Sequence, residues 1–422
     1  MRFCCVTLGC KVNQFESQAI ESIMASHGHT PVKPGEGSDV CVINTCAVTA
    51  ESARKSRQAI RRMRKTEPGA FIAVCGCYSQ LEPSAIQPLG VDLTAGCGHK
   101  REFVAEILAN RPPVLPPVPP VLFEDLPVGG GTARTRALLK VQDGCENYCA
   151  YCVVPFARGP VRSLPLARAA EQARLLDESG FMEIVVTGIE IASYGKDLEG
   201  DPKLTDVVRG ICSAAPHARI RLGSLDPGAL TEEYCLALQA NRNLCNHFHL
   251  SLQSGCDDTL KRMGRKYKPD DVRTTMQRLR RLFPDCGITA DLITGFPGET
   301  EREFKLSMEF IREAEFSDMH IFPYSPRPGT RAAAMPDQVE KSVRIKRSRI
   351  AAEIAERASR DFISGQTGKT VEVLFERKRG GNWTGHSDNY LEISVKNGGE
   401  KNSIRTVRIT GKEEGVIWGE IL

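Results

Sequence analysis

The stretch DGCENYCAYCVVP, residues 143–155, contains three cysteines spaced C-x3-C-x2-C: Cys145, Cys149 and Cys152. This spacing lets one short loop surround a metal centre. Structural zinc sites normally take four ligands, and common ferredoxin clusters take four cysteines at other spacings. A [4Fe-4S] cluster held by three thiolates keeps one iron free to bind another molecule. We therefore interpret the stretch as a three-cysteine [4Fe-4S] site; a zinc site with a distant fourth ligand, or a chance grouping, is the alternative.

The pattern around this loop predicts a barrel. From residue 137 to about residue 325, short apolar runs alternate with helical patterns. We expect strands at 137–142, 183–188, 218–223, 246–253, 287–294 and 318–324, and helices near 165–179, 204–214, 231–240, 269–283, 300–315 and 336–363. Six strands with intervening helices predict a partial (β/α)6 barrel, whose site would lie at the carboxyl ends of the strands.

Glycines and polar residues follow several of these strands, on the same rim as the cysteine loop. Glycine lets a backbone approach a ligand closely, and polar side chains can orient that ligand. A turn explains each stretch more simply when it is taken alone. Their shared rim makes a binding site the better interpretation, and the candidate residues are Gly188, Glu190, Asp226 and Gln253.

The first 110 residues predict a separate parallel sheet of the Rossmann or flavodoxin type. Expected strands at 3–8, 40–44, 71–74 and 91–95 alternate with expected helices at 14–26, 50–65 and 100–110. Cys10, Cys46 and Cys77 each fall just past a strand, and ligand sites gather at that edge of a parallel sheet. Spacing alone leaves open a second three-thiolate site or ordinary buried thiols. Cys97 also follows a strand, and nothing local excludes it from the same edge.

The expected helix after Cys46 has the strongest local charge in the chain. Its basic residues, with no acid among them, are Arg54, Lys55, Arg57, Arg61, Arg62, Arg64 and Lys65. On the other side, Ala53, Ser56, Ile60 and Met63 recur at helical spacing and predict the packing stripe. Solvated faces usually mix charges, so seven like charges favour a surface that binds nucleic-acid phosphates.

Two further segments complete the domain organisation. Residues 113–131 are rich in proline and glycine and predict a linker, partly extended and partly flexible. Residues 365–422 predict a small all-β module, with strands expected at 370–377, 390–395, 404–410 and 415–421. We therefore expect an N-terminal domain at 1–112, the linker, a barrel with trailing helices at 132–364, and the β module.

Composition limits the class of protein. With 422 residues, 41% hydrophobic and 26% charged, the chain fits a globular protein of two or three domains. No run of 18 apolar residues predicts a membrane span, and the start lacks the apolar core of a signal peptide. We expect a cytoplasmic location, where sixteen cysteines serve as metal ligands or buried thiols rather than disulfides. The net charge of +4 requires any nucleic-acid binding to use local patches.

These motifs together resemble the radical S-adenosylmethionine (SAM) methylthiotransferase family over nearly the whole chain. The similarity is to an N-terminal methylthiotransferase domain, a radical SAM barrel and a C-terminal TRAM domain. The motifs TLGCKVNQ at 7–14 and GCENYCAYC at 144–152 look like the MtaB-type members. Further matches are NTCAVT at 44–49, GCY at 76–78, HLSLQSG at 249–255 and DLITGFPGET at 291–300.

The resemblance implies two [4Fe-4S] clusters. Cys145, Cys149 and Cys152 would hold the catalytic, SAM-binding cluster, and Cys10, Cys46 and Cys77 an auxiliary one. Tyr151 would pack on the adenine of SAM, with core packing as its alternative, and Gly188, Glu190, Asp226 and Gln253 would contact its methionine and ribose. The chain departs from the family pattern at Cys97, where asparagine is expected, and at Glu190, where histidine is expected.

The resemblance also implies a reaction and partners. MtaB-type enzymes methylthiolate carbon 2 of threonylcarbamoyladenosine beside the tRNA anticodon, using one SAM for a 5′-deoxyadenosyl radical and another as methyl donor. The partners would be tRNA, a low-potential electron donor and a sulfur source, and we expect a monomer. Alternatives are the same chemistry on isopentenyladenosine in tRNA or on a ribosomal-protein aspartate, or a non-catalytic iron-sulfur protein that binds RNA.

Overall fold

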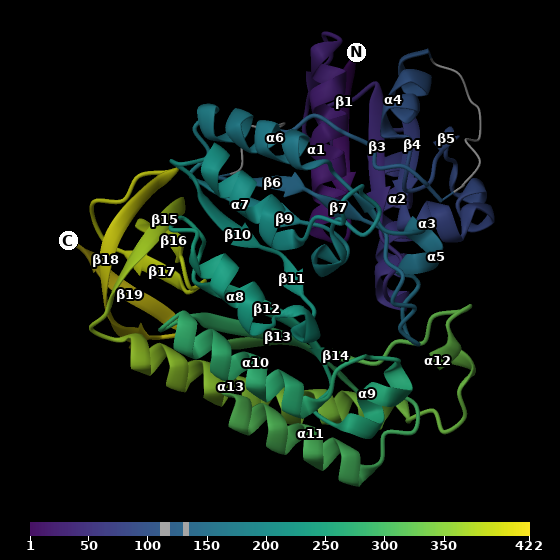
Figure 1. Ribbon diagram of the computed structural model, residues 1–422. Coiled ribbons are helices and arrows are strands. Elements are labelled where there is room, and N and C mark those ends of the chain that lie inside the picture. The colour runs from purple at the N-terminus through teal and green to yellow at the C-terminus, as the bar shows by residue number, and fades with distance from the viewer. Residues whose placement is uncertain (110–118, 130–134) are drawn as a thin grey trace.

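The computed structural model describes residues 1–109, 119–129 and 135–422, and its first unit is a five-stranded parallel sheet. In sheet order, its strands are β2 (Thr30–Pro31), β1 (Arg2–Thr7), β3 (Val40–Thr45), β4 (Phe71–Gly76) and β5 (Leu93–Thr94). Helices α1 (Lys11–Ser26) and α4 (Lys100–Ala109) cover one face and α2 (Ala50–Thr66) the other (Figure 1). Alternate residues of β3 therefore enter different cores, and the whole strand is buried. The expected parallel sheet is confirmed, and β2 is an addition of two residues.

The central unit is the expected partial barrel. Its parallel strands, in order, are β6 (Arg136–Lys140), β9 (Glu183–Thr187), β10 (Arg219–Leu222) with β11 (Ser224–Leu225), β12 (His247–Gln253), β13 (Gly287–Thr294) and β14 (Asp318–Pro323). The third strand is interrupted at Gly223, which separates β10 from β11. The outer helices are α6 (Leu166–Glu178), α7 (Leu204–Ala214), α8 (Glu232–Gln239), α10 (Pro269–Leu282) and α11 (Glu301–Ala314).

Several short elements of the structure were not expected from the sequence. They are α3 (Cys77–Leu81), α5 (Val154–Arg158), α9 (Asp257–Met263), α12 (Arg331–Ala334) and the strand pair β7 (Gln142–Asp143) and β8 (Arg162–Ser163). Such segments are too short to show a hydrophobic period. The helix expected at 336–363 is α13 (Lys341–Gln366), which begins after Pro336. No helix in the described ranges is long and apolar enough to cross a membrane.

The C-terminal unit is a closed barrel of five strands, as expected for a TRAM domain. Its strands, in barrel order, are β15 (Thr370–Arg379), β16 (Asn382–Ser387), β17 (Glu392–Val395), β19 (Val416–Ile421) and β18 (Ser403–Glu413). The sequence predicted four strands and missed β16. That segment, NWTGHS, has little apolar character, and it pairs with β15 across a Gly380-Gly381 turn.

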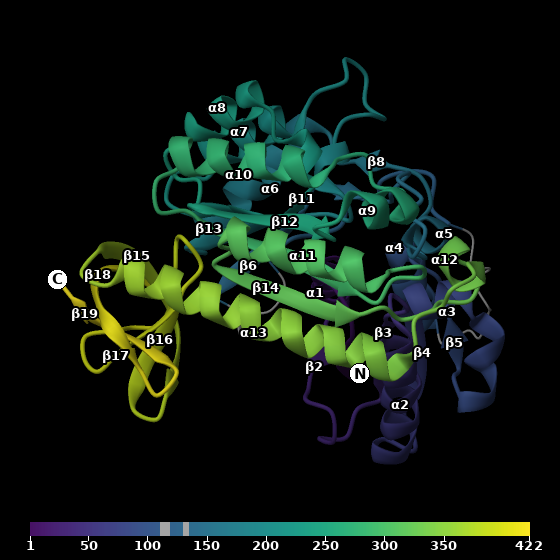
Figure 2. The same ribbon diagram turned by 90° about the horizontal axis from the view of Figure 1, so that it is seen from below.

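The three units lie in a row, with the central barrel between the N-terminal sheet and the C-terminal barrel (Figures 1 and 2). Helix α13 runs along the central barrel and leads into β15. The first residues of four strands contact the C-terminal barrel, and the first residue of a fifth, Glu183, holds one of these, Arg219. The four are Arg136, Arg219, His247 and Gly287. The C-terminal barrel therefore closes the amino end of the central barrel, opposite the rim that carries the cysteine loop.

The predicted linker is packed where the structure describes it. Leu126 is buried in a cluster with Phe15 of α1 and Leu138 of β6, and Asp125 pairs with Arg168 of α6 at 2.7 Å. Residues 119–129 are therefore a packed strap between two units, a role that the predicted linker, partly extended and partly flexible, did not include. The rest of that prediction, at 113–118 and 130–131, lies outside the described residues.

Candidate iron-sulfur and SAM site

The loop with Cys145, Cys149 and Cys152 leaves the carboxyl end of β6 through β7. Gly144 starts it with a φ of +73°, and a Cβ at this position would lie 1.7 Å from the carbonyl oxygen of Pro160. Only glycine fits so close an approach. The loop is anchored farther on by Ala150, whose N–H donates to Met263 O at 2.8 Å and whose carbonyl accepts from Ala332 N–H at 2.8 Å. The backbone therefore fixes where the three thiols stand.

The thiols of this loop lie in one another's electrostatic range. Burial raises the pKa of Cys145 to about 11 and that of Cys152 to about 12, and charge on Cys149 adds to both shifts. Two donors face the sulfurs: Val154 N–H donates to Cys152 Sγ at 3.4 Å, and Arg265 Nη1 donates to Cys149 Sγ at 3.3 Å. These raised pKa values keep Cys145 and Cys152 protonated without a metal, whereas coordination deprotonates a thiol outright. Three thiols with cationic and amide donors fit an anionic iron-sulfur group.

Glu190 and Gly188 lie beside this loop, in the turn after β9. Gln142 Oε1 accepts the N–H of Glu190 at 2.8 Å, while Gln142 Nε2 donates to Gly144 O at 2.7 Å, so one side chain joins both turns. A Cβ on Gly188 would lie 2.8 Å from the same Gln142 oxygen. Glu190 is 8% exposed, and its Oε1 has no hydrogen-bond partner among the described residues. Burial raises its pKa to about 7, with the charge of Asp226 adding to the shift.

Asp226 and Cys149 share one arginine. Arg265 Nη2 donates to Asp226 Oδ2 at 2.8 Å, while its Nη1 contacts the Cys149 sulfur. Tyr267 lies under the guanidinium, 4.9 Å from its centre to the ring. Arg265 was not predicted from the sequence, since it lies between α9 and α10 with no motif around it. The one signal in the sequence is its position directly after Gly264, the glycine that ends α9.

The remaining predicted SAM residues take different environments. Gln253 ends β12 with a φ of +66°, a strained conformation for a non-glycine residue, and is half-buried. Tyr151 is also half-buried and makes an edge contact with Phe296 at 6.4 Å between ring centroids. Tyr151 thus borders a small apolar cluster, which agrees with its alternative role as core, and the residue as a whole stays partly exposed. The carboxyl ends of β9 and β11 therefore bring Gly188, Glu190 and Asp226 to the cysteine loop through Gln142 and Arg265, while Gln253 lies at the end of β12.

The second cysteine set is assembled by the N-terminal fold. Cys10 begins α1 and is exposed, whereas Cys46 follows β3 and is buried. Asn13 joins their loops, because its Nδ2 donates to Leu8 O at 2.9 Å and to Thr45 O at 3.0 Å. A Cβ on Gly9 would lie 3.1 Å from Cys46 Sγ, so the two loops touch.

Cys77 completes this set at the start of α3. Gly76 before it has a φ of +103°, and a Cβ there would lie 2.4 Å from Asn44 Oδ1. Burial raises the pKa of both Cys10 and Cys46, and charge on Cys77 adds to the rise, which places the three thiols in mutual range. Asn44 Oδ1 is buried without a partner among the described residues. The fold thus brings together three thiols from separate strands, with glycines where they approach.

Cys97, the departure from the family pattern, lies directly against this set. Its Sγ is 3.7 Å from Cys77 Sγ, and its hydrogen bond to Cys77 is the main reason that the pKa of Cys77 falls to about 6. Lys100 is fully buried below it and donates to Cys97 O at 2.9 Å. The auxiliary surroundings therefore contain a fourth thiol and a cation.

The cysteine sets do not resemble a site for a single ion. No three His, Cys, Asp or Glu side chains converge at that spacing within residues 1–109, 119–129 and 135–422. A four-iron cluster binds its thiolates through different irons, so its cysteines stand farther apart than the ligands of one ion.

The basic helix α2 has the expected two faces, but only part of its charge is free. Ala53, Ser56, Ile60 and Met63 are its buried residues. Arg54 pairs with Glu51 and Arg64 with Asp92, both at 2.5 Å, and Arg57 donates to the Tyr78 hydroxyl at 2.9 Å. Four cations are exposed and unpaired within the described part of the chain: Lys55, Arg61, Arg62 and Lys65. We call these four residues the α2 basic face.

Comparisons with known proteins agree with this architecture. Residues 2–96 match the family described as "Uncharacterized protein family UPF0004", and residues 139–311 match the Radical SAM superfamily. The chain is 35% identical to the threonylcarbamoyladenosine tRNA methylthiotransferase MtaB of Bacillus subtilis, over 92% of this chain and 89% of that protein. It is 32% identical to the tRNA-2-methylthio-N(6)-dimethylallyladenosine synthase of Pelotomaculum thermopropionicum, over 89% and 86% of the two chains.

A solved structure also shares the fold. The radical S-adenosylmethionine methyltransferase TsrM of Kitasatospora setae, with cobalamin and a [4Fe-4S] cluster bound, superposes with a TM-score of 0.57 at 14% identity. The match covers 79% of this chain and 77% of TsrM, so the sheet and the barrel occur together in another protein. With both domains matched and a relative aligned over most of its length, the chain belongs to the radical SAM tRNA methylthiotransferase family, whose members use a [4Fe-4S] cluster and SAM.

Proposed function

We propose that this enzyme methylthiolates carbon 2 of threonylcarbamoyladenosine at position 37 of tRNA. The observation that carries the proposal is the meeting of two three-cysteine sets on one interface, within a chain aligned over most of its length with an MtaB enzyme. Two reactive centres at one interface suit a reaction that must both remove a hydrogen and insert sulfur. The chain would act as a monomer with tRNA, a low-potential electron donor and a sulfur source.

The residues described above have specific parts in this reaction. Cys145, Cys149 and Cys152 would hold the SAM-binding cluster, and Cys10, Cys46 and Cys77 the auxiliary [4Fe-4S] cluster. When bound, these groups with two SAM molecules supply hydrogen abstraction from the adenine carbon and the sulfur and methyl group that replace the hydrogen. The protein positions the reactants and excludes water while its cofactors supply this chemistry.

The SAM pocket would be formed by four strand-end residues: Gly188, Glu190, Asp226 and Gln253. The unpaired Glu190 oxygen is an acceptor for the ammonium or a ribose hydroxyl of SAM, since a buried polar atom normally has a partner. Arg265 holds Asp226 and Cys149 in fixed relation, so it orients the pocket against the cluster. Tyr151, which stays partly exposed, would contact the adenine ring.

The phosphates of the tRNA would be bound at a surface separate from the site of the reacting base. The α2 basic face presents four cations on the helix that follows Cys46, and phosphate contacts position nucleic acid without reading its sequence. The target base must leave its stack to reach the rim of the barrel, as enzymes that act on a base require.

Nucleoside mass spectrometry of tRNA from a strain that lacks this gene tests the substrate. We expect 2-methylthio-threonylcarbamoyladenosine to disappear and threonylcarbamoyladenosine to accumulate. Wild-type protein should restore the product and Cys145→Ala should not, while Cys212→Ala, which changes a buried cysteine on α7, serves as the matched control.

Other outcomes identify the alternatives. Loss of the methylthio group from dimethylallyladenosine instead would favour the function named for the Pelotomaculum relative. Unchanged tRNA would direct the search to a ribosomal-protein aspartate. Purified protein that forms no 5′-deoxyadenosine from SAM after anaerobic reduction would be a non-catalytic iron-sulfur protein.

A further inference from the structure

A buried group of charges lies between the two cysteine sets. Arg158, the last residue of α5, is fully buried. Its Nη1 donates to Glu16 Oε1 at 2.8 Å and to Asp143 Oδ1 at 3.0 Å, and its Nη2 donates to Asn13 Oδ1 at 2.7 Å. Lys140 Nζ lies 3.2 Å from Asp143 Oδ2, and Arg162 Nη2 lies 3.4 Å from the same oxygen. We call Glu16, Lys140, Asp143, Arg158 and Arg162 the junction network.

The junction network touches both cysteine sets. Asp143 Oδ1 accepts the N–H of Gly144 at 2.8 Å, directly before Cys145. Asn13 Oδ1, the acceptor of Arg158, lies 3.7 Å from the Cys10 thiol, and Asn13 Nδ2 holds the loop that leads to Cys46. The Arg158 guanidinium is therefore linked to each cysteine set through one hydrogen-bonded residue. Asp143 links it to the Cys145 loop, and Asn13 links it to the loops of Cys10 and Cys46.

The charges of the network do not cancel. Three cations face two carboxylates, so one positive charge is left over in a buried position. Lys100 is fully buried nearby, and it donates only to the carbonyl oxygens of Gly96 and Cys97, with no carboxylate within ion-pair distance in the described residues. A buried charge costs several kcal/mol unless a counter-charge compensates it. Together with the buried and unpartnered Nε atoms of Arg158 and Arg162 in the described chain, this excess points to an anion at this place.

A second buried network shows fully paired guanidinium donors, although its charges balance no better: within the described ranges, Arg136, Arg219 and Arg221 face only Glu183 and Glu376. At the amino end, Arg219 and Arg221 share Glu183, and every guanidinium nitrogen of both has an acceptor. In the junction network, Arg158 Nε and Arg162 Nε are buried without a partner among the described residues. The unpaired donors and the excess positive charge therefore lie at the same place, between the two cysteine sets.

We propose that Arg158 is a positioning residue for an anionic cluster at Cys10, Cys46 and Cys77. Its charge, acting through the junction network, stabilises this cluster and holds the cluster at a fixed place relative to the Cys145 loop. The inference rests on the auxiliary cluster of the proposed function. A [4Fe-4S] core of charge 2+ with three thiolates carries one net negative charge, opposite in sign to the excess charge of the junction network and of Lys100. One-electron reduction to the 1+ core adds a second negative charge, so a nearby cation favours reduction.

The test measures the reduction potential of the auxiliary cluster alone. Full-length protein with Cys145, Cys149 and Cys152 changed to alanine is reconstituted anaerobically, titrated with dithionite and followed by electron paramagnetic resonance. Arg158→Gln removes a positive charge and should make the midpoint potential more negative. Glu16→Gln removes a negative charge and should make it less negative. Arg221→Gln, an equally buried arginine at the other end of the barrel, should leave it unchanged.

The outcomes separate this inference from the proposed function. No iron in the reference protein would refute the auxiliary cluster itself. Iron with equal potentials in the reference, Arg158→Gln and Glu16→Gln proteins would overturn the role of Arg158 and leave the cluster standing. If Arg158→Gln fails to fold, the variants Arg158→Lys and Glu16→Gln test the proposal instead. Arg158→Lys should keep the reference potential, and Glu16→Gln should raise the potential. A purely structural role would not give shifts of opposite sign.

Discussion

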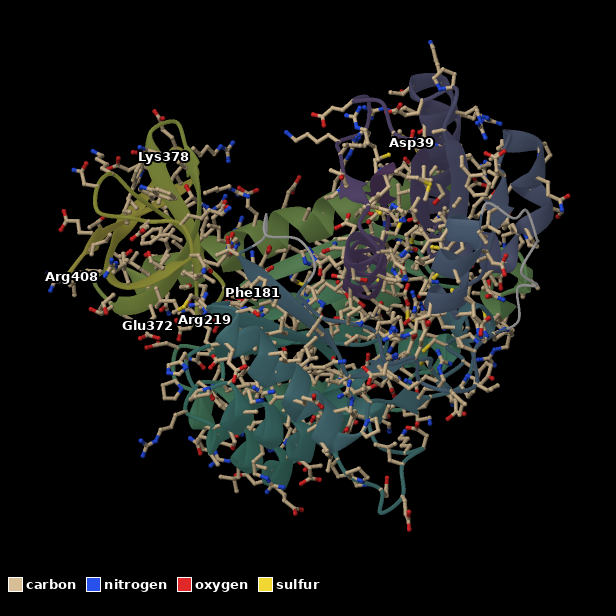
Figure 3. The ribbon with its side chains drawn as sticks, turned by 90° about the horizontal axis from the view of Figure 1, so that it is seen from above. Asp39, Phe181, Arg219, Glu372, Lys378 and Arg408 are labelled. Atoms are coloured by element: carbon tan, nitrogen blue, oxygen red, sulfur yellow. The ribbon has the colours of Figure 1, made fainter. Side chains whose placement is uncertain are left out.

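The two ends of the central barrel bury similar charges but differ in how completely those charges are paired. At the amino end, Glu183 holds Arg219 and Arg221, and the C-terminal barrel supplies carbonyl acceptors for the remaining donors; Figure 3 shows Arg219 beside Glu372 at this contact. At the carboxyl end, Arg158 Nε and Glu190 Oε1 have no partner in the described chain. Arginines with every donor paired suit a contact that holds units together, although His247 Nδ1 and Asp388 Oδ1 have no partner in the described chain at that end either. The unpaired groups at the carboxyl end lie beside the cysteine sets, where a ligand would complete them.

The strongest test of this contrast removes the cysteines at the carboxyl end. Wild-type protein should bind about eight irons, as two four-iron clusters. Changing Cys10, Cys46 and Cys77 to alanine should leave about half of that iron and preserve cleavage of SAM. Changing Cys145, Cys149 and Cys152 instead should abolish formation of 5′-deoxyadenosine. Iron analysis and product chromatography check both proteins, and unchanged iron in the first variant would contradict the auxiliary site.

The next test removes the shared carboxylate at the amino end of the central barrel. Glu183→Ala leaves the buried Arg219 and Arg221 without their carboxylate, and such a loss costs about 3–5 kcal/mol. We expect a much lower thermal unfolding midpoint but normal iron content and SAM cleavage per folded molecule. The control is Glu356→Ala on α13, which removes an exposed partner of Arg360 and should leave the midpoint unchanged. Loss of cleavage at full stability would show that this end is more than structural.

A third test addresses the α2 basic face, which adjoins the carboxyl end. Reversing Arg61, Arg62 and Lys65 to glutamate should weaken tRNA binding, because these cations are exposed and unpaired in the described chain. The slope of log affinity against log salt should decrease by about 0.7–0.9 for each phosphate that the variant no longer neutralises. Arg209, Arg242 and Arg281, exposed on the outer layer, give a control with the same change in net charge. Equal affinities in both variants would remove α2 as the phosphate surface.

The smallest expected effect is a pH dependence of stability at the amino end. Burial lowers the pKa of His247 well below its ordinary value, and the charge of Arg221 adds to the shift. The unfolded chain binds this proton near pH 6.5, so the contribution of neutral His247 is complete above that pH and declines as the pH falls below it. The limiting slope is about 1.4 kcal/mol per pH unit. His247→Gln should flatten the pH dependence of urea unfolding between pH 6.5 and 5, whereas exposed His27→Gln should not.

Local and topological signals in the sequence predicted different parts of this molecule. The cysteine loop at 145–152 is contiguous, so its spacing alone indicated a cluster. Cys10, Cys46 and Cys77 could be grouped only through the expected parallel sheet, which the structure confirms. For α2, the packing stripe was right, yet three of the seven cations have partners that helical spacing does not reveal, such as Asp92 for Arg64.

The features that the sequence did not predict depend on distant partners. Glu16 and Arg158 are 142 residues apart, and no periodic pattern connects them. The paired arginines at the amino end offered a weak signal, since charges at 219 and 221 fall on alternate positions of an expected strand and so face inward together. Residues 119–129 read as a spacer because proline content predicts an extended backbone but not what that backbone packs against.

The separation of Glu16 from Arg158 has a consequence for biosynthesis. A ribosome adds about 5–20 residues per second, so Arg158 is synthesised on the order of 10 s after Glu16. During that interval the nascent N-terminal sheet has its cysteines but lacks the guanidinium that its buried carboxylate requires. The auxiliary pocket is therefore finished only when the first part of the barrel has emerged. The proposed auxiliary cluster would then be assembled after that point, so that the order of translation separates an immature site from a mature one.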